Sequence, residues 1–108
     1  MDIQIQSHLR MSRAVSLGKH LKEIRIHLCQ TSEASKGVRD FVKNHYVPLK
    51  SSNPNFPILV RECQGISPVI YARYGFGYER NRSLERMNAD QVFQVISNFA
   101  NTAPPKTL

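Results

Sequence analysis

The sequence lacks most of the patterns that mark membrane, secreted and metal-binding proteins. No stretch approaches the roughly 20 consecutive apolar residues that a membrane-spanning helix requires, so we expect a soluble or peripheral protein. Only two cysteines, Cys29 and Cys63, are present. They are too few for the disulfide scaffold of a small secreted domain, and their spacing fits no zinc site.

Signals for catalysis are also scarce. The four histidines form no cluster with carboxylates or cysteines at metal-ligand spacing. Gly75-Phe76-Gly77 is an isolated pair of glycines in a turn rather than a phosphate-binding loop, and no Ser-His-Asp arrangement stands out. The residues therefore give no specific signal for a metal, a phosphate ligand or a hydrolytic triad.

Acidic residues are few, because 8 Asp and Glu stand against 15 Lys and Arg, for a formal net charge of +7. Such an excess favours an acidic partner, which could be nucleic acid, an anionic membrane surface or a negatively charged protein. A basic protein without any such partner is the alternative.

Residues 1–22 contain one acid, Asp2, together with four basic residues and several serines. A basic, serine-containing segment that is poor in acids resembles a mitochondrial targeting segment. A flexible tail without a targeting function is the alternative. Met11 is a second plausible start. We expect residues 1–22 to form a targeting-like or flexible extension outside the folded domain.

Hydrophobic patterning predicts one domain over residues 23–100, followed by a flexible tail at 101–108. Alternating apolar and polar residues predict a strand over 23–29. The stripe of Val38, Phe41 and Val42 predicts a helix that Ser35 caps and that Pro48 kinks or shortens. Further strands are expected at 58–63, 69–74 and 78–84, and a last helix is expected after Asn88.

The resulting order, β-α-β-β-β-α, predicts the α/β class, with a four-stranded mixed sheet and both helices on one face. The strand–helix–strand unit favours two parallel strands with a right-handed crossover, and the glycine turn favours an antiparallel hairpin. This is the minimal thioredoxin-like arrangement. The helix that usually joins its two halves would be replaced by the short connection over residues 64–68.

The second face of such a sheet would carry no helix. The strand alternation places Arg25, His27, Arg61, Tyr71 and Arg73 on it, with Cys29 and Cys63 in phase with them. Arg and Tyr are enriched at interface hot spots, so we predict that this face docks on a partner. A solvated face of a half-covered sheet is the alternative.

The two cysteines leave several possibilities open. Cys29 lies between a strand and a helical region, where thioredoxin-like oxidoreductases place Cys-x-x-Cys or Cys-x-x-Ser, and a nearby helix N-terminus would lower its pKa. A helix that begins only at Ser35 would leave Cys29 out of reach. Cys29 and Cys63 also end two strands that should pair in parallel, so a disulfide and two free thiols both stay possible. Pro68, at the start of the third strand, is a candidate cis-proline, with an ordinary trans proline as the alternative.

Several segments, in their order and spacing, closely resemble one known family over about residues 17–99. They are residues 23–30 (EIRIHLCQ), 37–41 (GVRDF), 53–54 (NP), 57–63 (PILVREC) and 72–74 (ARY) with Gly77. The family is the alpha-subcomplex subunit 2 of NADH dehydrogenase (ubiquinone), a thioredoxin-like accessory subunit of mitochondrial respiratory complex I.

This resemblance implies a non-catalytic subunit that supports assembly or stability of the peripheral arm of complex I, without a cofactor or a small-molecule substrate. It implies a peripheral position on the matrix side of the mitochondrial inner membrane, with other subunits of that arm as partners. Cys29 and Cys63 match the two cysteines of the family, which could form a disulfide. Mitochondrial ribosomal proteins of the same domain family are the alternative, although the aromatic residues form no stacking platform on the uncovered sheet face beyond Tyr71, which argues against nucleic acid. A thiol–disulfide oxidoreductase is a third hypothesis.

Overall fold

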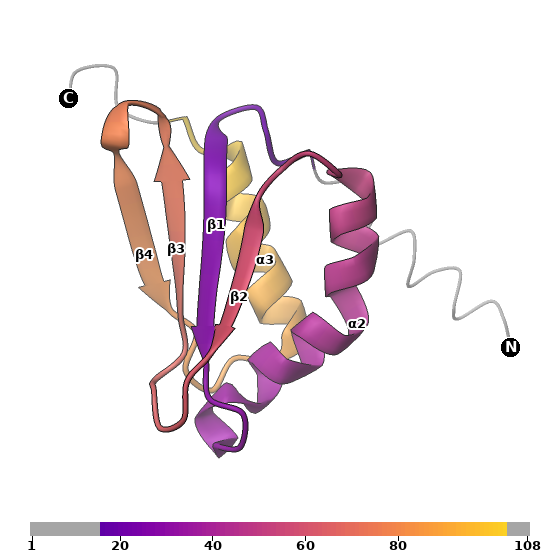
Figure 1. Cartoon of the computed structure of the whole chain (residues 1–108), viewed down its shortest axis with the longest axis vertical. Coiled ribbons are helices and arrows are strands. Elements are labelled where there is room, and N and C mark those ends of the chain that lie inside the picture. Colours follow the sequence, from indigo (N-terminus) through magenta and orange to yellow (C-terminus); the bar gives the residue numbers. More distant parts are fainter. Residues whose placement is uncertain (1–15, 104–108) are drawn as a thin grey trace, which may run out of the picture.

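A four-stranded mixed sheet forms one layer of the molecule and two α-helices form the other (Figure 1). The structure is a computed structural model that describes residues 16–103. Its elements are β1 (Leu21–Leu28), the 3-10 turn η1 (Glu33–Ser35), α2 (Lys36–Ser52), β2 (Ile58–Glu62), β3 (Val69–Tyr74), the 3-10 turn η2 (Gly75–Gly77), β4 (Glu79–Ser83) and α3 (Ala89–Asn101). The predicted class and element order are confirmed, whereas most of the predicted targeting-like extension, residues 1–15, lies outside the described residues.

The strand order is β2-β1-β3-β4, which places β1 inside the sheet. β1 pairs in parallel with β2, where Ile24 lies opposite Ile58, and antiparallel with β3, where Ile26 lies opposite Ile70. β3 and β4 form an antiparallel hairpin. The predicted parallel pair and the predicted hairpin are therefore both confirmed.

The core lies between the sheet and the two helices, which cover the same face (Figure 1). Alternate residues of β1 and β3 point into it because successive side chains of a strand face opposite sides. The largest fully buried side chains are Tyr74, Phe41, Leu17, Leu21, Ile24, Ile26, Leu28, Leu49, Ile70, Leu84, Ile96 and Val38. Because both helices lie on this side, the opposite face of the sheet has no helix over it.

The folded domain begins earlier than predicted. Leu17 and Leu21 are 0% and 1% exposed and belong to the core. The pairing of β1 with β3 shifts register between Leu21 and Glu23, so Lys22 is an extra residue in β1. This bulge reverses the alternation and keeps Leu21 on the buried side. The predicted boundary at residue 23 is therefore wrong, because residues 17–22 contribute to the core.

Helix α2 continues past the proline that was predicted to kink or shorten it. Pro48 lies inside the helix, which ends only at Ser52. Proline removes one backbone hydrogen bond, but Leu49 is buried immediately after it, and this burial holds the last turn against the core. Ser35 is the N-cap residue, yet its side chain caps nothing, because its hydroxyl accepts the N–H of Cys29 at 3.0 Å.

The start of α3 follows the prediction. Asn88 accepts the N–H of Gln91 at 2.8 Å, and the Gln91 side chain accepts the N–H of Asn88 at 2.9 Å, which completes a capping box. The beginning of α2 passes very close to this point. A Cβ on Gly37 would lie 1.6 Å from the carbonyl oxygen of Met87, so only glycine fits there.

Candidate functional site

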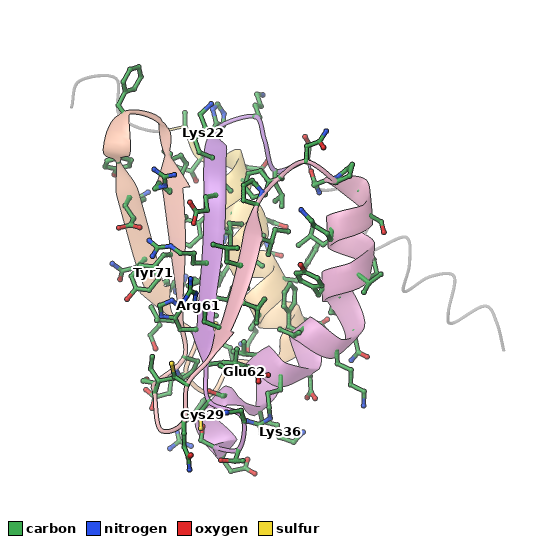
Figure 2. All side chains as sticks on the ribbon, in the orientation of Figure 1. Lys22, Cys29, Lys36, Arg61, Glu62 and Tyr71 are labelled. Carbon is green, nitrogen blue, oxygen red and sulfur yellow. The ribbon has the colours of Figure 1, made fainter. Side chains whose placement is uncertain are left out.

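The face of the sheet opposite the helices, called the open face below, contains all five residues that were predicted to dock. Arg61 and Tyr71 are labelled on it in Figure 2. Its side chains come from alternate positions of the strands: Glu23, Arg25 and His27 on β1; Leu59 and Arg61 on β2; Val69, Tyr71 and Arg73 on β3; and Glu79, Asn81 and Ser83 on β4. The structure brings the five residues together on three neighbouring strands, and their docking role stays a prediction.

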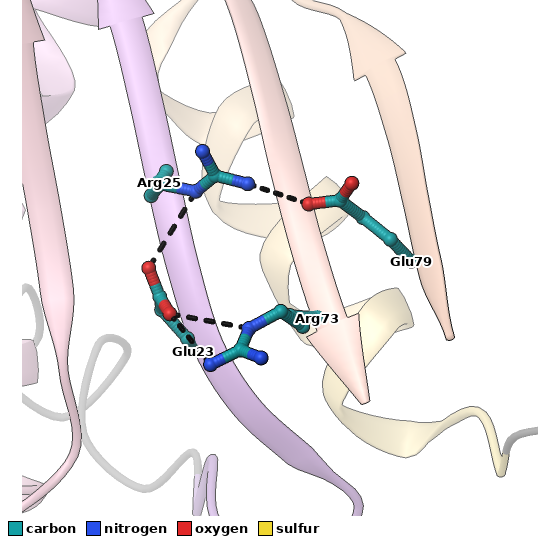
Figure 3. Close-up of polar contacts among 4 residues, drawn as sticks. All are labelled: Glu23, Arg25, Arg73 and Glu79. Carbon is teal, nitrogen blue, oxygen red and sulfur yellow. Dashed lines mark hydrogen bonds and ion pairs between the residues drawn. The ribbon is translucent and has the colours of Figure 1, made fainter. Parts of the chain in front are cut away.

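Two glutamates share this face with the arginines and link three strands through ion pairs (Figure 3). Glu23 pairs with Arg25 at 3.5 Å and with Arg73 at 3.1 Å, and Arg25 pairs with Glu79 at 2.5 Å. The sequence interpretation did not include either glutamate. Glu23 could have been found from its phase with Arg25, whereas Glu79 required the register of the β3–β4 hairpin.

The Tyr71 ring is packed beside two side chains of β1. The Arg25 guanidinium lies over this ring at 5.2 Å from its centroid, which is a cation–π distance. The His27 ring lies 5.2 Å from the Tyr71 ring, tilted by 54°. Because these side chains contact one another, each limits the motion of the others in the middle of the open face.

The open face carries little net charge despite its arginines. Three arginines stand against two glutamates on it, which leaves an excess of one positive charge with histidine neutral. Within residues 16–103, Arg25 and Arg73 take part in ion pairs, and Arg61 takes part in none. The unbalanced charge therefore lies at Arg61, beside the 40% exposed Leu59.

Cys29 forms a second candidate site at the end of β1. Its side chain is 2% exposed, and its Sγ accepts the N–H of Gly65 at 3.2 Å. The Arg39 guanidinium donates to the carbonyl oxygens of Cys29, at 3.0 Å, and of Ser32, at 2.8 Å. This arginine closes the loop after β1 around the sulfur.

Backbone N–H groups make the Cys29 thiol unusually acidic. Hydrogen bonds from the backbone of Thr31, Gly65 and Ser32 lower the pKa of Cys29 from 9.0 to about 6, and they outweigh the opposing effect of burial. The predicted cause was the helix N-terminus. The structure instead assigns the acidity to the N–H groups of two connecting segments.

Cys63 lies beside Cys29, since the parallel register ends with Leu28 opposite Glu62, and the Cys63 N–H donates to the Leu28 carbonyl at 2.9 Å. Both cysteines are free thiols in the structure, Cys29 buried and Cys63 exposed, so the disulfide stays a prediction. The cis-proline prediction is wrong, because the described residues contain no cis peptide bond. Pro68 has the ordinary trans form of a proline that precedes a strand, where no N–H is needed.

We expect the folded protein with Cys63→Ser to titrate its remaining thiol with a midpoint near pH 6, and the same protein unfolded in urea near 9. The folded pKa is the lower one, so the thiolate contributes stability that is complete above pH 9 and is lost as the pH falls through about 6. Ultraviolet absorbance of the thiolate measures both midpoints, with the Cys29→Ser, Cys63→Ser double variant as the blank. A folded midpoint near 9 would contradict the hydrogen-bonded thiolate.

Within residues 16–103, no group of three or more His, Cys, Asp or Glu side chains is placed to hold a metal ion. In the same part of the chain, no helix combines the length and the apolar character needed to cross a membrane.

Comparison with known proteins adds a consistent set of relatives. The profile of the family described as "Mitochondrial ribosomal protein L51 / S25 / CI-B8 domain" matches residues 38–89. The chain is 51% identical over 87 residues to NADH dehydrogenase (ubiquinone) 1 alpha subcomplex subunit 2 of Mus musculus, a match that covers 81% of this chain and 88% of the relative. It is 43% identical over 91 residues to the Arabidopsis thaliana protein of the same name, covering 84% and 94%. It is 40% identical over 89 residues to the NADH-ubiquinone oxidoreductase 10.5 kDa subunit of Neurospora crassa, covering 82% and 95%.

Proposed function

Since the chain belongs to the family of NADH dehydrogenase (ubiquinone) 1 alpha subcomplex subunit 2, we propose that it is an accessory subunit of mitochondrial respiratory complex I. The observation that carries this proposal is the extent of the likeness, which covers at least 81% of the chain in relatives from an animal, a plant and a fungus. All three relatives are named as subunits of this enzyme.

The fold proposed for this subunit is the thioredoxin-like one. Its support is the strand order β2-β1-β3-β4, with one parallel pair, two antiparallel pairs and both helices on one face. Residues 63–68 join β2 to β3 without a helix. This short connection leaves the open face uncovered, which suits a protein that is bound through that face.

The proposed role is structural rather than catalytic. Cys29 has the acidity of a reactive thiol, but the residue is only 2% exposed and its sulfur already accepts the Gly65 N–H. The third residue after it is Ser32, so the loop lacks the second thiol of a Cys-x-x-Cys pair and matches only the one-thiol Cys-x-x-Ser form. These features disfavour a thiol–disulfide oxidoreductase, because a substrate disulfide has no direct path to the Cys29 sulfur.

Docking through the open face is proposed as the way in which this subunit is held, with the peripheral arm on the matrix side as its place. The preorganised Arg25–Tyr71 contact and the ion pairs of Glu23 and Glu79 form a rigid polar surface. Arg61 adds one uncompensated charge that suits an acidic side chain of a neighbouring subunit. The ribosomal alternative fits less well, because the one aromatic ring in the middle of this face, Tyr71, already contacts Arg25 and His27.

Arg61→Glu is expected to reduce incorporation into complex I several-fold without lowering the stability of the isolated protein. The exposed Arg61 makes no ion pair within residues 16–103, so its reversal breaks nothing inside the chain while it repels an acidic partner. Quantitative mass spectrometry of the complex resolved on native gels measures the incorporated fraction.

Lys43→Glu is the matched control, because it makes the same charge change on the exposed side of α2, away from the open face. Equal incorporation of both variants would contradict docking through Arg61. The same gels test the proposed function itself. Migration of the wild-type protein with NADH dehydrogenase activity supports it, and migration with ribosomes would favour the alternative.

A further inference from the structure

The tip of the β3–β4 hairpin presents one bare aromatic side chain. Phe76 is 98% exposed, whereas the other exposed large hydrophobic side chains within residues 16–103, Val47 and Leu59, are 66% and 40% exposed. The Phe76 backbone has a φ of 60° and a ψ of 29°, in the left-handed region that favours glycine. A large apolar side chain therefore occupies a position that would suit glycine better, and it gains no packing within the chain in return.

The tip is held rigidly from below. The Tyr74 N–H donates to the Tyr78 carbonyl at 2.7 Å, and the Tyr78 N–H donates to the Gly75 carbonyl at 3.3 Å. The Tyr74 hydroxyl donates to the Phe99 carbonyl of α3 at 2.8 Å, which fastens the base of the turn to the helix layer. The rings of Tyr74 and Tyr78 also lie 5.7 Å apart. The backbone that carries Phe76 is therefore held in place, while its side chain is exposed.

Charged side chains of both signs surround the base of this tip. Arg73 and Glu79 lie opposite each other at the ends of β3 and β4, and both belong to the ion-pair network of the open face. Lys22 lies close to the turn, since a Cβ on Gly75 would be 3.8 Å from its Cε. An aromatic side chain with a polar rim is the usual anatomy of an interface hot spot.

We propose that Phe76 is an anchor that inserts into an apolar pocket of a neighbouring protein subunit, so that the docking surface extends from the open face over the hairpin tip. The inference rests on the proposed function, and it adds Phe76 and an apolar contact to the docking surface. A protein pocket fits better than a lipid bilayer, because a single ring flanked by charges of both signs offers too little apolar area for membrane binding. A ring on a rigid support also loses little conformational freedom when it enters a pocket.

The test is incorporation of the full-length protein into complex I in cells that lack their own copy. Phe76→Gly removes the ring and supplies the residue that the backbone prefers, so the isolated variant should melt at or above the temperature of the wild-type protein. Its incorporation at limiting expression should fall about tenfold, as expected when an interface hot spot is lost. Phe76→Leu should restore part of that loss because it keeps an apolar side chain. Val47→Ala, which trims an exposed apolar residue of α2, is the control and should incorporate normally.

The outcomes separate the anchor from the function. If the wild-type protein stays outside the complex, the proposed function is overturned. If the wild-type protein and Phe76→Gly enter equally well, the function stands and the anchor is overturned. Normal incorporation of Phe76→Gly with weaker binding to anionic phospholipid vesicles, or with loss of self-association, would assign Phe76 to a membrane or to a second copy of the chain instead.

Discussion

Gly37→Ala is expected to lower the free energy of unfolding by about 3 kcal/mol, a large part of the stability of a domain of this size. The new methyl group would meet backbone atoms: the Met87 carbonyl oxygen at 1.6 Å, the Met87 carbonyl carbon at 2.6 Å and the Asn88 Cα at 2.8 Å. The usual gain of alanine over glycine in a helix, about 1 kcal/mol, is too small to offset such a clash.

The opposing segment cannot move aside easily. The Met87 N–H donates to the Leu84 carbonyl at 3.1 Å, and the Arg86 N–H donates to the Ala34 carbonyl at 3.0 Å. A shift large enough to admit the methyl group would strain these bonds and the capping box of α3. Urea unfolding followed by circular dichroism measures the loss, with Gly18→Ala as the control because no atom lies within 4 Å of its added Cβ. Equal midpoints for the two variants would contradict the close approach of α2 and α3.

Leu17→Ala is expected to destabilise the protein by about 3 kcal/mol, within the range for leucines truncated in a packed core. Leu17 is fully buried, and its N–H donates to the Asn53 side-chain oxygen at 3.0 Å, which ties the segment before β1 to the end of α2. If residues 1–22 were an extension outside the folded domain, the substitution would not change the free energy of unfolding. The same urea measurement therefore decides where the folded domain begins.

Leu59→Ala is the matched control for this truncation. It removes the same atoms from the open face, where Leu59 is 40% exposed, and it should change the free energy of unfolding by no more than about 0.5 kcal/mol. A Leu17 variant as stable as the Leu59 variant would place the segment before β1 outside the core.

The elements that could be predicted from the sequence are those that local rules determine. Alternation over residues 23–29 marked β1, and Asn88 marked the start of α3. The bulge at Lys22 was missed, because it exists only in the pairing of β1 with β3 and interrupts the alternation that the prediction followed. The end of α2 at Ser52 was missed for a similar reason. Burial of Leu49 in the core outweighs the local tendency of Pro48 to end a helix.

The candidate site also contains some residues that local rules predict and others that depend on the tertiary structure. Five residues of the open face were predicted correctly as neighbours because the period of two holds on β1, β2 and β3. The partner of Arg25 across the hairpin, Glu79, depends on strand register. The acidity of Cys29 depends on the N–H of Gly65, which is 36 residues away. The left-handed backbone of Phe76 could not be read from Gly-Phe-Gly, because either glycine could have carried the turn.

The interior position of β1 also shapes how the chain can be built. β1 is the earliest strand of the described part, yet both of its partners, Ile58–Glu62 and Val69–Tyr74, are synthesised tens of residues later. Until then its two edges stay unpaired and its apolar side chains stay exposed, a state that invites aggregation. The sheet can close only once β3 is available, so folding is governed by long-range contacts and is slower than in a helical bundle of equal length. A chain that ended before β3 would leave β1 with one edge permanently open, and it would be a target for chaperones rather than a smaller version of the same subunit.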